Sequence, residues 1–219
     1  MMTNASVLEK WEQWLDTIGA DIVNLLHRRQ IFREVQQIVV NNPRIQRPNV
    51  FYDWMASTYA ASSVIGVRRQ VDEDSRAISL LKLMREIRRS PEVLTRERHL
   101  ARYREVNPEM EKAGDREFDR FAGQGNPHID PRGVQDDISE LLEATEHLEQ
   151  YATRRVVHFD AEAPPIIPTF DDLDRALDLL ERLLKKYRRL ILVEGGDVVP
   201  IVVDAWKGIF MEPWIVPLG

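Results

Sequence analysis

The chain has 219 residues, of which 43% are hydrophobic and 30% charged, and its formal net charge is −6. This length supports one sizeable core, and the negative charge argues against a protein whose whole surface binds nucleic acid, although a local basic cleft is compatible with it. The absence of cysteine excludes disulfides, thiolate metal sites and cysteine nucleophiles. With no secretory signal and no stretch near the roughly 18 uninterrupted apolar residues of a membrane span, we expect a single cytoplasmic domain over residues 1–219.

Helical periodicity dominates the first third of the chain. Apolar residues recur at helical spacing from Val7 to Val40, which predicts one long helix or two with a break near Gly19. We interpret residues 1–48 as an N-terminal helical extension that ends in a proline-containing connector. A second helix is expected from a cap at Asn49 to Arg69. Its apolar stripe is formed by Phe51, Trp54, Met55, Thr58, Ser62 and Ile65.

The middle of the chain is less regular. A third helix is expected after Asp74 and Ser75, and Ser90 followed by Pro91 predicts a further helix start. The polar segment that follows contains several glycines, so residues 105–129 are a candidate mobile insertion with a short helix at residues 115–122.

Two strong helices are predicted in the last half. Asp130 and Pro131 begin one that runs to Phe159, and Thr169, with Asp172 three residues later, begins the other. Brief apolar runs at residues 190–193 and 197–204 are interpreted as a possible small C-terminal β-hairpin. The pattern as a whole predicts an all-α bundle of long antiparallel helices, and it lacks the glycine-rich phosphate loops and the Gly-x-Ser-x-Gly elbow of several enzyme classes.

Polar side chains form a stripe on the helix that begins at Asp130. His147, Tyr151, Arg154 and His158 follow one another at spacings of four, three and four residues. On a helical wheel this stripe lies about 130° from the centre of the apolar stripe, so His158 is not expected in the core.

Two interpretations of this stripe stay open. Arg154 and Arg155 can belong to a solvated helix end, where cations complement the free carbonyls and the helix dipole. Alternatively, His158 moves a proton while arginine holds a phosphate and Tyr151 stacks or donates, and these functions suffice for RNA cleavage by its own 2′-hydroxyl. Asp160, two residues after His158, is a candidate orienting carboxylate.

No metal site is expected. His147 and His158 lie three turns apart, and the other three histidines fall in separate segments, so the chain offers no helical pair of histidine ligands. We also expect no cofactor.

Several segments together resemble the HEPN superfamily, in its branch resembling the bacterial type U abortive-infection protein. The resemblance covers most of the chain from about Asn49 onward. It rests on the segments "FYDWMASTYAASSVIGVRRQVDEDSRAISLLKLMREI", "TRRVVHFD", "PTFDDLDRALDLL" and "DAWKGIF".

The resemblance implies a helical, homodimeric, metal-independent RNA endonuclease of a toxin or antiphage defence system, with RNA as substrate and an antitoxin or other protein as partner. Arg154 would stabilise the phosphate and His158 would act as general acid or base, assisted by Arg155, Tyr151, Asp160 and His147. Three residues separate Arg154 from His158, a shorter gap than in the family signature, and Arg155 replaces its polar residue. The alternative is therefore a non-catalytic helical dimer that binds a partner protein or a nucleotide.

Two further arginines are candidates for the same cleft. Arg69 falls on the predicted apolar stripe of its helix, where a charge needs a partner such as Asp72. One interpretation is an ion pair that fixes two helices. In the other, Arg68 or Arg69 faces the cleft of His158 and holds phosphate.

Overall fold

The computed structural model describes residues 3–158, 160, 161, 164, 166–194 and 204–212, and in these ranges it contains helices and no strand. The α-helices are α1 (Asn4–Val40), α2 (Val50–Gln70), α3 (Leu80–Arg89), α4 (Arg96–Val106), α5 (Glu111–Ala122), α6 (Pro131–Tyr151) and α7 (Phe170–Leu192). Shorter helical turns are η1 (Pro91–Val93), η2 (Pro108–Met110), η3 (Ala152–Val157) and η4 (Asp204–Phe210). The predicted all-α class is confirmed.

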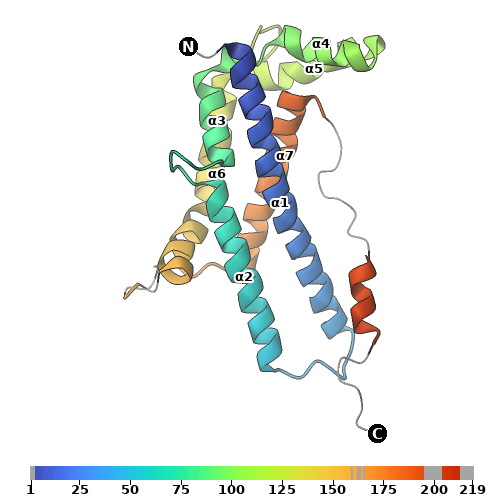
Figure 1. Cartoon of the computed structure of the whole chain (residues 1–219), viewed down its shortest axis with the longest axis vertical. Coiled ribbons are helices and arrows are strands. Elements are labelled where there is room, and N and C mark those ends of the chain that lie inside the picture. Colours follow the sequence, from blue (N-terminus) through green and yellow to red (C-terminus); the bar gives the residue numbers. More distant parts are fainter. Residues whose placement is uncertain (1–2, 159, 162–163, 165, 195–203, 213–219) are drawn as a thin grey trace.

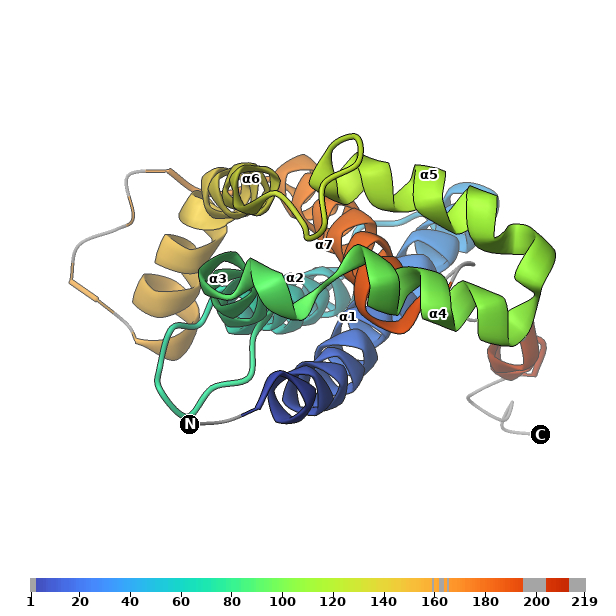
Figure 2. The ribbon, with the colours of Figure 1, turned by 90° about the horizontal axis from the view of Figure 1, so that it is seen from above.

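The long helices form an antiparallel bundle. α1 runs down the molecule, α2 and α3 return along nearly one line, α6 runs down and α7 returns (Figure 1). α4 and α5 lie across the end of the bundle where α3 ends and α6 begins (Figure 2). The predicted arrangement of long antiparallel helices is therefore confirmed.

α1 contributes one side of the core. It is continuous through Gly19, so the break considered there does not occur, and it packs against α2, α3 and α7. Trp11 is completely buried and donates its indole N–H to Glu86 Oε2 of α3 at 2.8 Å. A buried side chain of this kind contributes about 2 kcal/mol or more through lost apolar surface. The segment 1–48, interpreted as an N-terminal extension, thus contains α1, which is one of the packed helices of the bundle.

Helix starts follow the predicted caps in three cases. The side chains of Asn49, Asp130 and Thr169 each accept a backbone N–H of the following helix, and Thr169 and Asp172 form the predicted capping box. Ser90 behaves differently, because its side chain makes no capping bond and only the short turn η1 follows. The helix itself begins after Thr95, which caps α4.

The buried face of α2 differs from the predicted one. Phe51, Trp54 and Thr58 are exposed, whereas the buried residues are Tyr59, Ser63, Val64, Gly66, Val67 and Gln70. Small residues explain this choice, because a Cβ added to Gly66 would lie 2.3 Å from Leu25 Cδ2 of α1. Leu25 of α1 therefore packs against the glycine face, while Phe51, Trp54 and Thr58 remain exposed.

Residues 115–122 and 190–204 are the remaining segments for which secondary structure was predicted. The short helix expected at residues 115–122 lies within α5. The hairpin prediction is wrong in its first strand, because Leu190 and Ile191 are buried in α7, where helix packing outweighs the preference of these residues for a strand. Its second strand, residues 197–204, lies outside the described residues except for Asp204, which begins η4.

Candidate functional site

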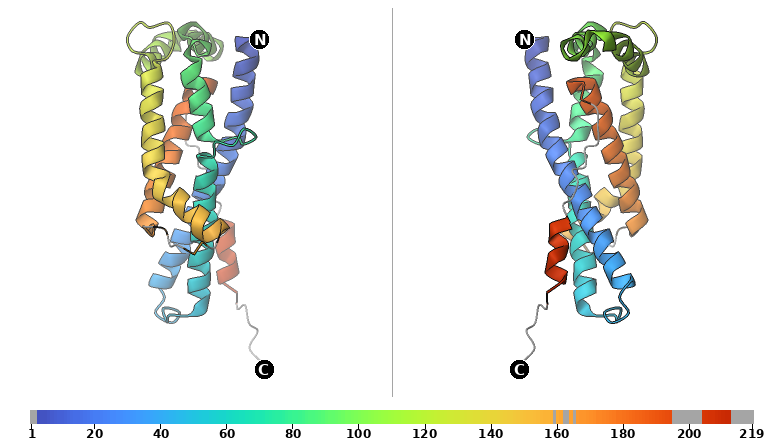
Figure 3. Two further views of the ribbon diagram at one scale, coloured as in Figure 1. Left: turned by 90° about the vertical axis from the view of Figure 1, so that its left-hand side faces the viewer. Right: turned by 90° about the vertical axis from the view of Figure 1, so that its right-hand side faces the viewer.

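The helix predicted to run from Asp130 to Phe159 changes type near its end. It is α-helical only to Tyr151, and η3 is a π-helical turn of six residues. The predicted α-helix to Phe159 is therefore wrong after Tyr151, and because a π turn accommodates about one more residue than an α turn, it alters the direction of every side chain that follows. Such turns occur frequently at functional sites. The turn lies across α2 on one side of the bundle (Figure 3).

Two backbone hydrogen bonds fasten the end of this turn. The N–H of His158 donates to the carbonyl of Thr153 at 3.0 Å, and the N–H of Asp160 donates to the carbonyl of Arg154 at 3.1 Å. The guanidinium of Arg155 also donates to the Asp160 carbonyl at 3.4 Å. His158 itself has extended backbone angles and so leaves the helical path while its chain neighbours hold it in place.

The side chains of Arg154 and His158 are available to a ligand. His158 is exposed and Arg154 is half-buried, which confirms that His158 lies outside the core. Within the described part of the chain, neither side chain has a hydrogen-bond or ion-pair partner. Most arginines of this protein are paired with carboxylates, for example Arg29 with Asp178 and Arg96 with Asp119. The guanidinium N–H groups of Arg154 are therefore available to bind a ligand.

Arg68 of α2 lies beside the turn. Its Nε donates to Thr153 Oγ1 at 3.2 Å and is 3.8 Å from Glu149 Oε1. Thr153 in turn donates its hydroxyl to Glu149 at 3.3 Å. These contacts place Arg68 against the start of the turn, where it links α2 to η3 and to the end of α6. Thr153 and Glu149 were not predicted, because their role depends on α2 packing against the turn.

Arg69 forms an ion pair between two helices. Its guanidinium is exposed and forms a two-pronged ion pair with Asp21 of α1, so the expected pairing with Asp72 is wrong. The interpretation as an ion pair between two helices agrees with these contacts. Arg69 lies outside the group that includes Arg68, Thr153 and Glu149.

The remaining predicted residues are spread out. Tyr151 is half-buried and packs against the core, Asp160 is exposed beside Arg155, and His147 is exposed on α6. His147 precedes His158 by eleven residues, a distance of about 16 Å along a helix. Arg154, Arg155, His158 and Asp160 thus lie on one fastened turn or directly after it, Arg68 contacts that turn at Thr153, and His147 and Arg69 lie elsewhere.

An acidic groove adjoins this group on the side of α6. It has a volume of about 550 Å³, and Arg68 is its one basic lining residue. Five carboxylates line it: Asp72, Glu73, Glu143, Glu146 and Glu149. Such a groove repels phosphates, so an anionic ligand of the turn must approach from the side of Arg154 and His158.

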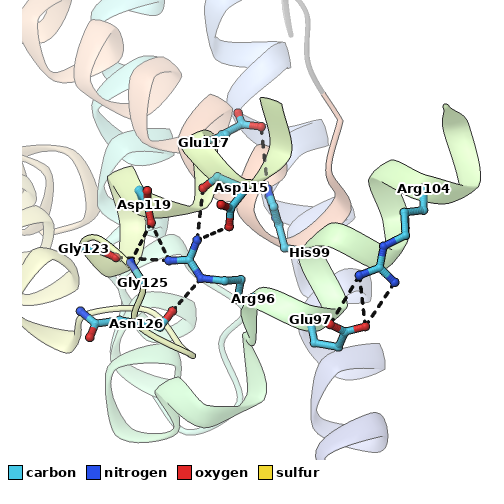
Figure 4. Close-up of polar contacts among 10 residues, drawn as sticks. All are labelled: Arg96, Glu97, His99, Arg104, Asp115, Glu117, Asp119, Gly123, Gly125 and Asn126. Atoms are coloured by element: carbon cyan, nitrogen blue, oxygen red, sulfur yellow. Dashed lines mark hydrogen bonds and ion pairs between the residues drawn. The ribbon is translucent and has the colours of Figure 1, made fainter. Parts of the chain in front are cut away.

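A second polar cluster joins α4 to α5 and was not predicted as a unit. Arg96 reaches the carboxylates of Asp115 and Asp119, and it also donates to the Asn126 carbonyl at 2.9 Å (Figure 4). Nearby, the buried His99 lies 3.8 Å from Glu117, which also pairs with Arg189 of α7 at 2.9 Å. Burial and the adjacent Glu117 raise the pKa of Tyr103 to about 12. These contacts are internal, so we assign the cluster a structural role.

Comparison of the chain with protein-family models, with curated proteins and with solved structures gave no match. No helix in the ranges that the structure describes is both long and apolar enough to cross a membrane.

Proposed function

We propose that this protein is a HEPN-like, homodimeric, metal-independent RNA endonuclease that acts in the cytoplasm in a bacterial defence or toxin setting. The observation that carries the proposal is the π-helical turn, whose fastened backbone carries Arg154 and, four residues later, His158, neither with an ion pair among the described residues. A histidine and an arginine of this kind match the needs of phosphodiester cleavage.

The proposed chemistry uses the 2′-hydroxyl of RNA as nucleophile. His158 removes the hydroxyl proton as the oxygen attacks the adjacent phosphorus, and the bond from phosphorus to the 5′-oxygen of the next nucleotide breaks. Arg154 pairs with the phosphate oxygens as negative charge develops, while Arg155 and Arg68 add positive potential. The leaving oxygen takes a proton from the His158 of the other subunit. The products are a 2′,3′-cyclic phosphate and a 5′-hydroxyl.

Cleavage of a mixed RNA pool in EDTA tests this proposal. Wild-type protein, His158→Ala and Arg154→Ala are purified side by side, and His128→Ala serves as the matched control because His128 is also exposed but precedes the opposite end of α6. We expect loss of about 10²-fold or more in the first two variants and none in the control. The reaction should leave cyclic phosphate ends and should fail on a strand with 2′-deoxy nucleotides.

His158→Ala should also fold normally, because the exposed ring makes no described contact that stabilises the bundle. Equal cleavage by wild type and His158→Ala would exclude the proposed site. Unfolding of the variant by several kcal/mol would instead show that His158 has a structural role.

A non-catalytic dimer that binds a partner protein or a nucleotide is the second candidate. The observation that favours it is the shape of the site in one subunit, where His158 is exposed and the adjoining groove is acidic. This candidate predicts no RNA cleavage by any variant. It also predicts that Arg154→Ala weakens binding of an anionic ligand, or of a protein partner such as an antitoxin, without any change in turnover.

A further inference from the structure

The end of the bundle where the chain turns from α1 into α2 differs from the rest of the surface. The turn of residues 41–49 and the adjoining ends of the two helices project beyond η3 and the start of α7 (Figures 1 and 3). Phe210 lines the same groove as Ile38 of α1 and Phe51 of α2, so the end of η4 lies beside this hairpin. We call residues 40–54 and 209–211 together the bundle tip.

Large apolar side chains are concentrated at the bundle tip. Val50 is 82% exposed, Met211 is 83% exposed and Trp54 is 59% exposed. Half of the exposed large apolar side chains in the described ranges lie at the tip, since five more are found there: Val40, Ile45, Phe51, Ile209 and Phe210. Such a concentration is typical of a surface that binds another molecule or a membrane.

The charge of the bundle tip is also unusual for this chain. About one residue in six of the protein is acidic, yet residues 35–52 contain no aspartate or glutamate. Arg44 and Arg47 lie in this stretch, are exposed and have no ion pair among the described residues. Asp53 and Glu212 border the surface, and Asp53 lies in the first turn of α2, where the positive end of the helix dipole offsets its charge. The tip therefore presents two guanidinium groups among apolar side chains.

Hydrogen bonds within the turn hold these side chains outward. The hydroxyl of Tyr52 donates to the Ile45 carbonyl at 2.7 Å. The side chain of Asn49 caps α2 and also donates to the Arg47 carbonyl at 3.0 Å. Polar groups that are bonded within the turn lose less when the turn moves from water to less polar surroundings. The turn is thus suited to contact an apolar phase.

Apolar side chains with arginines beside them match the surface of an anionic membrane. Tryptophan is enriched where the headgroups meet the acyl chains, because its ring is apolar and its N–H is polar. Arginine is attracted by anionic headgroups. Trp54 lies about 6 Å along α2 from Val50, which is within the 5–10 Å that the apolar residues of peripheral proteins enter the bilayer.

The shape of the tip favours a membrane over a protein partner. The exposed apolar side chains come from α1, the turn, α2 and the end of η4, so they surround a projecting end instead of forming one flat face. A fluid apolar phase covers such an end from several sides, whereas a specific protein partner buries about 800 Å² of complementary surface. An apolar groove of about 350 Å³, lined by Val39, Met55 and Phe210 among others, adds room for the end of an acyl chain.

We propose that the bundle tip attaches this protein to the surface of anionic membranes. Val50 and Ile45 enter the region between headgroups and acyl chains, and Trp54 lies at the level of the headgroups. Arg44 and Arg47 pair with lipid phosphates. The attachment is peripheral and needs both contributions, because one weak anchor alone binds a bilayer only marginally.

This inference goes beyond the proposed function and does not depend on it. The cytoplasmic leaflet of a membrane is anionic, so attachment is compatible with action in the cytoplasm. Binding to vesicles is measured without RNA. Without vesicles, Arg44→Gln/Arg47→Gln should cleave RNA as the wild type does, so failure of attachment and failure of cleavage are separate results.

Co-sedimentation with lipid vesicles is the first test. The full chain is mixed at about 0.1 M salt with vesicles of phosphatidylglycerol and phosphatidylcholine in equal parts, or with vesicles of phosphatidylcholine alone. Each arginine near an anionic surface strengthens binding about fivefold, so we expect about 30-fold weaker binding to the neutral vesicles. Higher salt should weaken binding to the anionic vesicles.

Paired arginine variants test the charge contribution. Arg44→Gln/Arg47→Gln should reduce binding to the anionic vesicles about 30-fold. Arg116→Gln/Arg120→Gln makes the same change of charge at two exposed arginines of α5, which lies at the opposite end of the bundle. This control should bind as the wild type does, because charges farther away than the Debye length of about 10 Å are screened.

Two apolar variants test the other contribution. Trp54→Ala should weaken binding about tenfold or more, because most of the apolar surface of the ring no longer leaves water. Met110→Ala, at an exposed side chain between α4 and α5, should have no effect. Circular dichroism should show equal helix content in all variants.

A fluorescent label reports contact with the bilayer without a disruptive variant. The chain has no natural cysteine, so Val50→Cys and Met110→Cys each carry a single environment-sensitive dye. With anionic vesicles, emission from the label at residue 50 should brighten and move to shorter wavelength. Emission from the label at residue 110 should stay as it is in water.

Wild-type protein that does not bind the anionic vesicles would overturn the proposal. Equal binding to neutral and anionic vesicles, or equal losses in the two paired arginine variants, would refute the role of Arg44 and Arg47. A label at residue 50 that stays in water while vesicles are bound would place the contact elsewhere. A complex with a protein, lost in Trp54→Ala and formed without any binding of vesicles, would assign the tip to a protein partner instead.

Discussion

His99 is expected to make the stability of the bundle depend on pH, and His99→Leu should remove that dependence. The ring is 1% exposed, neither ring nitrogen has a hydrogen bond to a described residue, and its nearest charged group is Glu117 at 3.8 Å (Figure 4). Phe118 and Tyr103 lie against it, with ring centroids 5.3 Å away. Burial lowers the pKa of His99, and Arg98 and Arg96 lower it further, while the nearby Glu117 raises it in part. His99 is thus held neutral in the folded protein.

The sign of the effect follows from this lowered pKa. In the unfolded chain the ring titrates near its ordinary pKa of about 6.5. The stability that comes from the neutral ring is complete above about pH 6.5 and is lost as the pH falls from there through the folded-state pKa. One proton changes the free energy of unfolding by at most about 1.4 kcal/mol per pH unit. At about pH 5.5 the loss is therefore up to about 1.4 kcal/mol.

Urea unfolding at about pH 8 and about pH 5.5 measures this effect. Titration of the many carboxylates is common to all variants, so it cancels in the difference between wild type and His99→Leu. The wild type should lose up to about 1.4 kcal/mol more than the variant over this range. His128→Leu, at an exposed histidine, should behave like the wild type. Equal losses in wild type and His99→Leu would refute the reasoning.

Two substitutions, each with a matched control, test the polar contacts that fix the long helices. Tyr187→Phe removes the hydroxyl that donates to the buried Asp137 at 2.8 Å, so the free energy of unfolding should fall by about 1.5–3 kcal/mol. Tyr52→Phe, which removes a hydroxyl bonded to the Ile45 carbonyl near the surface, should cost less than about 1 kcal/mol in the same urea titration. Thr169→Ala removes the capping box of α7 and should cost about 1 kcal/mol, whereas Thr169→Ser should be nearly neutral. Equal thermal stability of these two variants would contradict the capping role.

Helix ends could be predicted because their determinants are local. Thr169 and Asp172 satisfy each other's backbone groups within four residues, so the sequence of that turn alone contains the information. Asn49 and Asp130 cap their helices by the same local rule. The helix start predicted at Ser90 was wrong, because the chain after Pro91 forms only one short turn and Thr95 then caps α4.

The buried face of α2 could not be predicted because it depends on distant residues. Periodicity places Phe51, Trp54 and Ile65 on one face of α2, but it does not show whether another helix packs against that face. Gly66 was the signal that pointed to the opposite side, since only a residue without a side chain permits the approach of Leu25. Arg69 was misassigned with the same stripe, and its partner Asp21 lies 48 residues away in the sequence.

The exposure of His158 was predicted, but the backbone that carries it was not. His158, Arg154 and Asp160 were chosen by residue type and spacing, and the wheel that placed His158 outside the core assumed an α-helix through Phe159, whereas the chain is π-helical from Ala152. The contribution of Arg68 was left open between two interpretations, and its contacts to Thr153 and Glu149 show only that it links α2 to the end of α6 and to η3. The π-helical turn had no signal in the sequence pattern, because apolar periodicity continues through Val156.

The π-helical turn also determines how this segment responds to a change in length. An added residue in a helix rotates the following side chains by about 100°, and a π turn is the form in which a helix absorbs such an addition. Deletion of one residue between Ala152 and Val157 would return the segment to α-helical register. His158 would then point about 100° away from its present direction while every side chain of the site remained in the sequence. A related chain would therefore gain or lose the arrangement of Arg154 and His158 more readily through an insertion or deletion in these six residues than through a substitution.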